Sequence, residues 1–94
     1  MQVTKDCYSA FYRTDLTKSL KDINVDTLVI TGILSTVCVE STARDAVFEG
    51  FHTTIAEDAV GDAPEDTAAF LKRFKTYFGQ VQNSETICRQ WIET

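Results

Sequence analysis

The sequence has no apolar run of the roughly 18 residues that a membrane-spanning helix needs, so we expect no association with membranes. It also lacks an excess of basic residues. Its 9 Lys and Arg stand against 14 Asp and Glu, a net charge of −5, which argues against nucleic acid as a partner. With a single proline and 11% aromatic residues, it does not have the composition of a disordered tail. Several charges near the N-terminus argue against a signal peptide.

Histidine and cysteine are scarce as well. His52 is the only histidine, and the 3 cysteines form no Cys-x-x-Cys pair, so no cluster has the spacing of metal ligands. An odd number of cysteines with no such pair favours free thiols in a reducing compartment. We therefore expect a cytoplasmic protein with reduced cysteines, holding neither a metal ion nor another cofactor.

The length of 94 residues suffices for a single domain, residues 1–94, and the apolar periodicity predicts that strands alternate with helices. Residues 27–32, T-L-V-I-T-G, form an apolar run typical of a strand buried on both faces of a parallel sheet. The alternation predicts an α/β fold with right-handed crossovers and helices covering the sheet. The expected strands are residues 2–5, 27–32, 52–57 and 80–82, and the expected helices are residues 15–22, 36–49, 64–78 and 84–92.

The segment after residues 27–32 is where a site is expected, because open α/β sheets bind ligands beyond the carboxyl ends of their strands. Cys38 lies there, in the first turn of the next helix, where free N–H groups and the helix dipole favour a thiolate and can hold an oxyanion. Lys5 ends the expected first strand and therefore points to the same edge. From position alone, a buried inert thiol and a solvated lysine remain the commoner roles for such residues.

Other polar candidates have less support. Cys7 lies in a loop without an obvious base, and Cys88 falls on the apolar stripe of the last helix, so both are expected to be inert. Glu40 is expected to be solvated.

Two linked motifs give the chain a family resemblance. Residues 5–16 read K-D-C-Y-S-A-F-Y-R-T-D-L, and residues 28–46 read L-V-I-T-G-I-L-S-T-V-C-V-E-S-T-A-R-D-A. The chain resembles the isochorismatase-like cysteine hydrolases, a superfamily that includes nicotinamidases, N-carbamoylsarcosine amidases and biuret or ureidoacrylate amidohydrolases. Their pattern is K-x-x-x-S-A-F-x-x-T-x-L, followed by a strand that ends in G-x-x-T-x-x-C-V-x-x-T-A-x-D-A. The resemblance implies a Rossmann-like, three-layer α-β-α fold.

The resemblance also implies a mechanism. Cys38 would attack an amide carbonyl of a small molecule, ammonia or an amine would leave, and water would hydrolyse the thioester. Lys5 would polarise the site and support proton transfer. The backbone N–H groups of Leu34 and Cys38 would form the oxyanion hole, and a cis peptide bond is implied between Ile33 and Leu34. The cysteine argues against a true isochorismatase, because those enzymes typically carry glycine at this position.

Four apolar residues are candidates for lining the substrate pocket: Phe11, Tyr12, Ile33 and Leu34. An aromatic residue that follows a strand nevertheless belongs more often to the core, because aromatic side chains bury a large area. Ser35 stands where the family more usually has threonine, which is a mild departure from the pattern.

The resemblance covers only the C-terminal half of such an enzyme. The family's general-base aspartate, and the metal ligands of nicotinamidases, would precede Met1, and neither Asp6 nor Asp15 matches that base. We therefore expect a cysteine-dependent hydrolase of C–N bonds that is incomplete without an N-terminal half. The alternative is a non-catalytic α/β module that serves binding or assembly.

The absence of an N-terminal half also suggests which partners the chain would have. An apolar strand at residues 27–32 without all its neighbours leaves an edge that invites pairing with another chain. We expect a homo-oligomer or a complex with a separate N-terminal half. The strand that ends at Lys5 is expected to run parallel to residues 27–32, either paired with them directly or separated from them by another chain.

Overall fold

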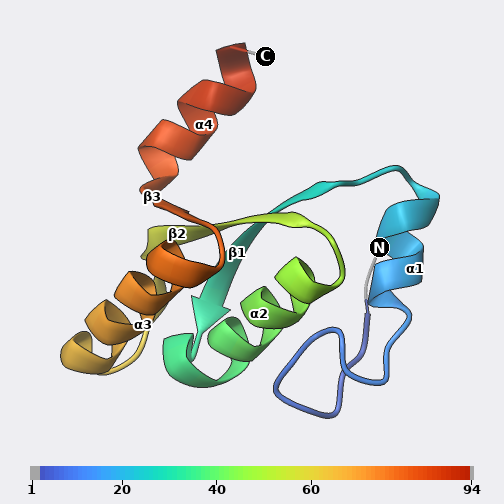
Figure 1. The fold of residues 1–94 in the computed structure, drawn as a ribbon, viewed down its shortest axis with the longest axis horizontal. Helices are drawn as coiled ribbons and strands as arrows, with labels where there is room; N and C mark the ends of the chain where they lie inside the picture. The colour runs from blue at the N-terminus through green and yellow to red at the C-terminus, as the bar shows by residue number, and fades with distance from the viewer. Residues whose placement is uncertain (1–2, 94) are drawn as a thin grey trace.

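The computed structural model describes residues 3–93, and it has an α/β architecture built on one parallel sheet (Figure 1). The strands are β1 (Thr27–Ile33), β2 (His52–Gly61) and β3 (Gln80–Gln82), in the order β1-β2-β3. Both pairs of neighbouring strands are parallel, which confirms the predicted fold class. The helices are α1 (Leu16–Asp22), α2 (Glu40–Phe48), α3 (Pro64–Tyr77) and α4 (Ser84–Glu93), and a π-helical turn, η1 (Ser35–Val39), leads into α2.

Helices lie on both sides of the sheet. Figure 1 shows α2 and α3 together on one side of the strands, whereas α4 extends on the other side. The main core lies under α2 and α3, where β2 contributes the fully buried Ile55. A second cluster joins α1 to the C-terminal part of α2 around Leu20, Ala46 and Phe51. The residues of the main core are Val39, Ala43, Ile55, Phe70 and Phe74.

The expected first strand is not found. Residues 3–5 adopt no regular structure, and the remaining residue of that predicted strand, Gln2, lies outside the described residues. A strand needs a hydrogen-bonded neighbour for its N–H and C=O groups, and no described strand pairs with this segment. The prediction of a strand ending at Lys5, parallel to residues 27–32, is therefore wrong for the described residues.

The position of β1 also differs from expectation. Its residues are either exposed or half-buried, and none is fully buried as a strand covered on both faces would be. The reason is that β2 is its only partner within the described part of the chain, so β1 forms an edge and β2 occupies the centre of the sheet. The register of this pair shifts between Ile30 and Gly32, where the two strands approach the carboxyl end of the sheet.

Phe70 tests how much of the stability comes from the main core. Its side chain is fully buried, so Phe70→Ala should lower the free energy of unfolding by about 3–5 kcal/mol, through lost burial and the resulting cavity. Tyr77→Ala on the same helix is the control, because Tyr77 is 76% exposed and its loss should change stability by no more than about 0.5 kcal/mol. Urea denaturation of both variants measures the difference, and equal losses would contradict this location of the core.

Asp58 provides a test of acid sensitivity. Its Oδ1 accepts the Ser84 N–H at 2.8 Å and the Ser84 hydroxyl at 2.7 Å, which ties β2 to the start of α4. The hydroxyl bond is the main cause that holds the pKa of the Asp58 carboxyl below its ordinary value. The carboxylate therefore stabilises the fold above the unfolded-state pKa of about 3.9, and this contribution disappears as the pH falls through the lower folded-state pKa.

Asp58→Asn should consequently be less stable than the parent protein near neutral pH. The difference should narrow as the pH falls below about 3.9 and through the lowered folded-state pKa of Asp58, where the parent carboxyl becomes protonated as well. Denaturation curves over a pH series measure this, and a difference that stayed constant with pH would show that the charge of Asp58 is irrelevant.

Candidate active site

Lys5 and Cys38 lie together although they are 33 positions apart in the sequence. The Lys5 Nζ is 4.0 Å from the Cys38 Sγ, and it also donates a hydrogen bond to the Cys7 carbonyl oxygen at 2.8 Å. Cys38 is half-buried in η1, just beyond the carboxyl end of β1, and Lys5 is exposed. The fold therefore places a cation beside the thiol at the edge of the sheet where a site was predicted, even though Lys5 reaches it from a loop.

The turn that holds Cys38 is tightly hydrogen-bonded. Both the Val37 N–H and the Val39 N–H donate to the Leu34 carbonyl oxygen, at 3.2 Å and 3.1 Å. The peptide bond between Ile33 and Leu34 is cis, as the family resemblance implied. Gly32 precedes it with φ +123°, a conformation that glycine adopts without the steric cost of a Cβ atom.

A cavity of about 320 Å³ opens between the N-terminal loop, β1, η1 and α2. The loop is attached to α2 by a hydrogen bond from the Ala10 N–H to the Thr42 Oγ1 at 2.9 Å. Among the described residues, no carboxylate lines this cavity, so it contains a thiol and an ammonium group but no acidic side chain. Its lining consists of Lys5, Ala10, Val29, Ile30, Thr31, Ile33, Cys38, Val39 and Thr42.

The four predicted pocket residues are placed differently from one another. Ile33 lines the cavity, whereas Leu34, which is 46% exposed, does not. Phe11 packs its ring 5.9 Å from that of Phe51 in the cluster around α1. Tyr12 is exposed, and the guanidinium of Arg13 lies 5.2 Å from the centre of the Tyr12 ring. The apolar neighbours at α1 hold Phe11 away from the cavity, which is the ordinary core role of an aromatic residue.

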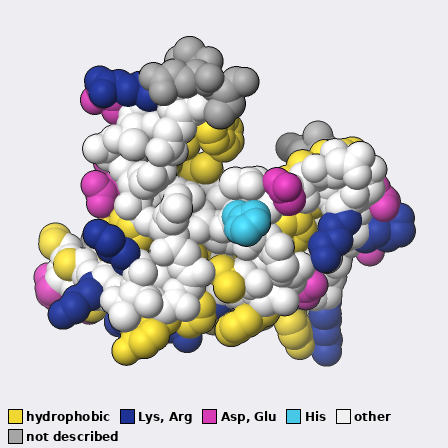
Figure 2. All heavy atoms as spheres, turned by 45° about the horizontal axis from the view of Figure 1, so that its top comes forward, with side chains coloured by type: hydrophobic (Ala, Val, Ile, Leu, Met, Phe, Trp, Pro, Cys, Tyr) yellow, Lys and Arg dark blue, Asp and Glu magenta, His cyan; other side chains and the backbone are white. Residues whose placement is uncertain are grey.

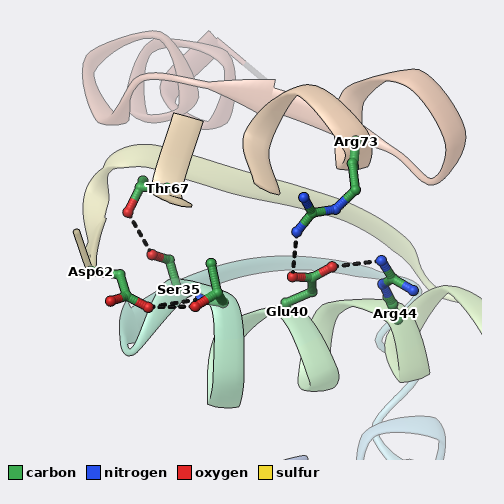
Figure 3. A network of polar contacts seen from close by, with 7 residues as sticks. Ser35, Glu40, Arg44, Asp62, Thr67 and Arg73 are labelled. Carbon is green, nitrogen blue, oxygen red and sulfur yellow. Dashed lines mark hydrogen bonds and ion pairs between the residues drawn. The ribbon is translucent and has the colours of Figure 1, made fainter. Parts of the chain in front are cut away.

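Sequence reasoning missed Asp62, which follows directly after β2. Its Oδ2 accepts the Thr36 hydroxyl at 2.5 Å and the Thr36 N–H at 3.4 Å, and its Oδ1 accepts the Ala63 N–H at 2.8 Å. The Thr36 hydroxyl is the main cause that lowers the pKa of the Asp62 carboxyl. Figure 3 shows Asp62 and Thr67 pointing toward the turn that contains Ser35. The sequence could have indicated Asp62, because an acidic residue directly after a parallel strand lies at the edge of the sheet where sites form.

Glu40 was expected to be solvated, and that prediction is wrong. Its side chain is only 13% exposed and forms ion pairs with Arg44 at 2.6 Å and Arg73 at 2.9 Å (Figure 3). The Arg44 guanidinium also lies 4.9 Å from the centre of the Phe78 ring. The spacing of four residues between Glu40 and Arg44 was visible in the sequence, but the contact with Arg73 depends on how α2 packs against α3.

Cys7 and Cys88 are both exposed, so the apolar stripe on which Cys88 was predicted to lie is not covered at this residue. The face of the sheet beside α4 is open, and Figure 2 shows hydrophobic side chains at the surface next to the C-terminal helix. Cys88 lies in a shallow, mostly apolar groove there together with Val29, Ala56 and Trp91. A stripe predicted from helical periodicity is buried only if another element covers it.

Two further features concern the described residues alone. They contain no group of three His, Cys, Asp or Glu side chains placed to hold a metal ion. None of their helices is both long enough and apolar enough to cross a membrane.

Comparison with known proteins agrees with this geometry. The model of the isochorismatase domain matches residues 1–86. The chain is 40% identical over 88 residues to the ureidoacrylate amidohydrolase RutB of Yersinia enterocolitica, a match that covers 92% of this chain and 38% of that protein.

Solved structures show the same relationship. An isochorismatase-like hydrolase from Alkaliphilus metalliredigens superimposes with a TM-score of 0.90 at 31% identity, over 95% of this chain and 50% of that one. The nicotinamidase/pyrazinamidase PncA from Bacillus subtilis superimposes with a TM-score of 0.81 at 36% identity, over 84% of this chain and 44% of that one. The chain thus spans half or less of the length of these relatives. Because the domain model matches nearly all of the chain, and the motifs around Lys5 and Cys38 agree with it, the protein belongs to the isochorismatase family.

Proposed function

We propose that this chain is the nucleophile-bearing part of an amide hydrolase that acts on a small molecule. The observation that carries the proposal is the 4.0 Å approach of Lys5 Nζ to Cys38 Sγ inside the cavity at the end of β1. Membership of the family supports it, since one relative is named an amidohydrolase and another a nicotinamidase. Three free cysteines in the chain are consistent with a reducing, cytoplasmic location, which we include in the proposal.

The proposed reaction has two stages. The Cys38 Sγ attacks the amide carbonyl carbon, and the oxygen that becomes negative is held by the backbone N–H groups of Leu34 and Cys38. The C–N bond then breaks, and the amine leaves with a proton. In the second stage, water attacks the thioester and releases a carboxylic acid and the free thiol. Lys5 stabilises negative charge on the sulfur and assists proton transfer, because its ammonium group lies beside the Sγ.

A general base has to come from elsewhere, since no carboxylate of the described residues lines the cavity. We propose that the part of the isochorismatase fold outside this chain supplies it and pairs with β1. Two observations support this arrangement: the relatives are about twice as long as the chain, and β1 has a free edge that carries the 75% exposed Ile33. The missing base also keeps open the alternative of a non-catalytic α/β module for binding or assembly.

Thiol labelling tests the role of Cys38. Exposure alone would make Cys88 react before the half-buried Cys38. If Lys5 activates the Cys38 sulfur, brief treatment with iodoacetamide near neutral pH should instead label Cys38 first, as peptide mass spectrometry can show. Lys5→Met should reverse the order, and labelling of Cys88 first in the parent protein would contradict activation.

Amide hydrolysis tests the reaction itself. In the complete enzyme, Cys38→Ala should lower kcat/KM for nicotinamide or a ureido amide by at least about 10³-fold, and Lys5→Met by about 10²- to 10⁴-fold. Cys88→Ala is the control and should leave the rate unchanged, because Cys88 lies outside the cavity. Full activity in Cys38→Ala would exclude the proposed nucleophile.

Assembly is tested with the 94-residue chain alone. Light scattering should show association rather than a monomer, since the free β1 edge and the apolar groove beside α4 favour contact with more protein. Amidase activity should be absent until the remaining half of the fold is added. A stable monomer with enzyme-like turnover would refute the need for that half, and a stable, active homodimer would show that a second copy takes its place.

A further inference from the structure

We propose that Asp62 is a positioning residue for the Cys38 nucleophile, acting through Thr36, an inference that rests on the proposed function. Asp62 lies in the segment between β2 and α3, whereas Thr36 lies in η1, two residues before Cys38. The hydrogen bonds between them join the turn of the nucleophile to the neighbouring strand–helix connection. No other acid among the described residues is bonded to this turn.

The carboxylate is matched to its three donors. One oxygen accepts both the hydroxyl and the N–H of Thr36, and the other accepts the Ala63 N–H. The two N–H groups are fixed by the backbone and approach different oxygens, so both oxygens must be acceptors. An asparagine would direct its NH₂ group at one of these N–H donors, and the shape of the side chain would be kept while one hydrogen bond is lost.

The Asp62 bonds add an attachment to a turn that is also held by the core and by the hydrogen bond between Ser35 and Thr67. Val37 and Val39 donate to the Leu34 carbonyl, and the Val39 side chain is buried in the main core. Thr36 instead donates its N–H to Asp62, so η1 is anchored from outside at this residue. On the opposite side of the cavity, the loop of Lys5 is anchored through the bond between Ala10 and Thr42. The Lys5–Cys38 separation is therefore restrained by attachments on both sides of the cavity, of which the bond between Asp62 and Thr36 is one.

The structure contains a matched control. Asp58 binds the N–H and the hydroxyl of Ser84 with one oxygen, just as Asp62 binds those of Thr36, but it acts at the start of α4. Both carboxyls have a pKa below the ordinary value, and a hydroxyl bond is the main cause for each. Asp58→Asn removes the charge from a comparable attachment of a serine, and it should weaken the fold without touching the turn that contains Cys38.

The experiment measures the rate of Cys38 alkylation by iodoacetamide relative to Cys88 in the same sample, together with kcat and KM in the complete enzyme. Asp62→Asn and Thr36→Val should each lower the labelling ratio. They should reduce kcat by about 10- to 100-fold while KM changes little, because a misplaced nucleophile slows attack without weakening binding. Thr36→Ser, which keeps the hydroxyl, should restore most of the rate. Asp58→Asn should leave the absolute rate of Cys38 alkylation and kcat at parent values, even where it alters the labelling of Cys88 on α4.

The outcomes separate the possible roles. If Asp62→Asn and Thr36→Val lose stability as Asp58→Asn does but keep the parent ratio and kcat, Asp62 has only a structural role and the proposal is overturned. Thr36→Val retains the bond from Ala63 to Asp62, so it gives an answer even if Asp62→Asn does not fold. If the parent enzyme hydrolyses no amide while the labelling ratio still falls in both variants, the proposed function fails and the positioning of Cys38 by Asp62 is supported.

Discussion

The burial of Val39 between β2 and α3 is the contact on which the site depends. Val39 is only 3% exposed and packs in one cluster with Ile55, Phe70 and Phe74. Burial of these side chains fixes the start of α2 against the sheet, and the next residue upstream, Cys38, is then held at the rim with its side chain in the cavity. The position of the thiol is therefore a consequence of core packing as well as of local turn geometry.

Around this contact, an ion pair and a hydrogen bond fix the position of α3 relative to η1 and α2. Glu40 joins α2 to α3 through Arg73, and Ser35, which is fully buried, shares a hydrogen bond of 2.8 Å with Thr67 of α3. Directional bonds of this kind select one orientation between two helices that apolar contact alone would allow to slide. The packing of η1 and α2 against α3 thus combines an apolar core with polar contacts beside it.

The other side of the molecule has a contrasting character. The face of the sheet next to α4 and the free edge of β1 are open, and Trp91 is 61% exposed beside them. The cavity at Lys5 and Cys38 lies along the same edge strand, since Val29, Thr31 and Ile33 of β1 line it. The proposed partner segment that pairs with β1 would therefore contact the same strand that lines the cavity.

The sequence by itself determined the order of the helices and strands from residue 15 onward, and it singled out the residues predicted for the site. The β-branched run at residues 27–32 and the proline and acidic residues at the start of α3 predicted strand and helix correctly, because local propensity and helix-end electrostatics act within a few residues. The linked motifs pointed to Lys5, Cys38 and the cis bond between Ile33 and Leu34, which the structure brings into one turn and one cavity.

Only the tertiary structure decided which predicted strands, apolar stripes and polar side chains are in contact with other parts of the chain. Residues 3–5 form no strand and Cys88 is exposed, because a strand needs a neighbour and an apolar stripe needs a cover. Glu40 pairs with Arg73, and Asp62 binds Thr36, through contacts between residues 33 and 26 positions apart. Local patterns cannot reveal such contacts, since they exist only after the helices have packed on the sheet.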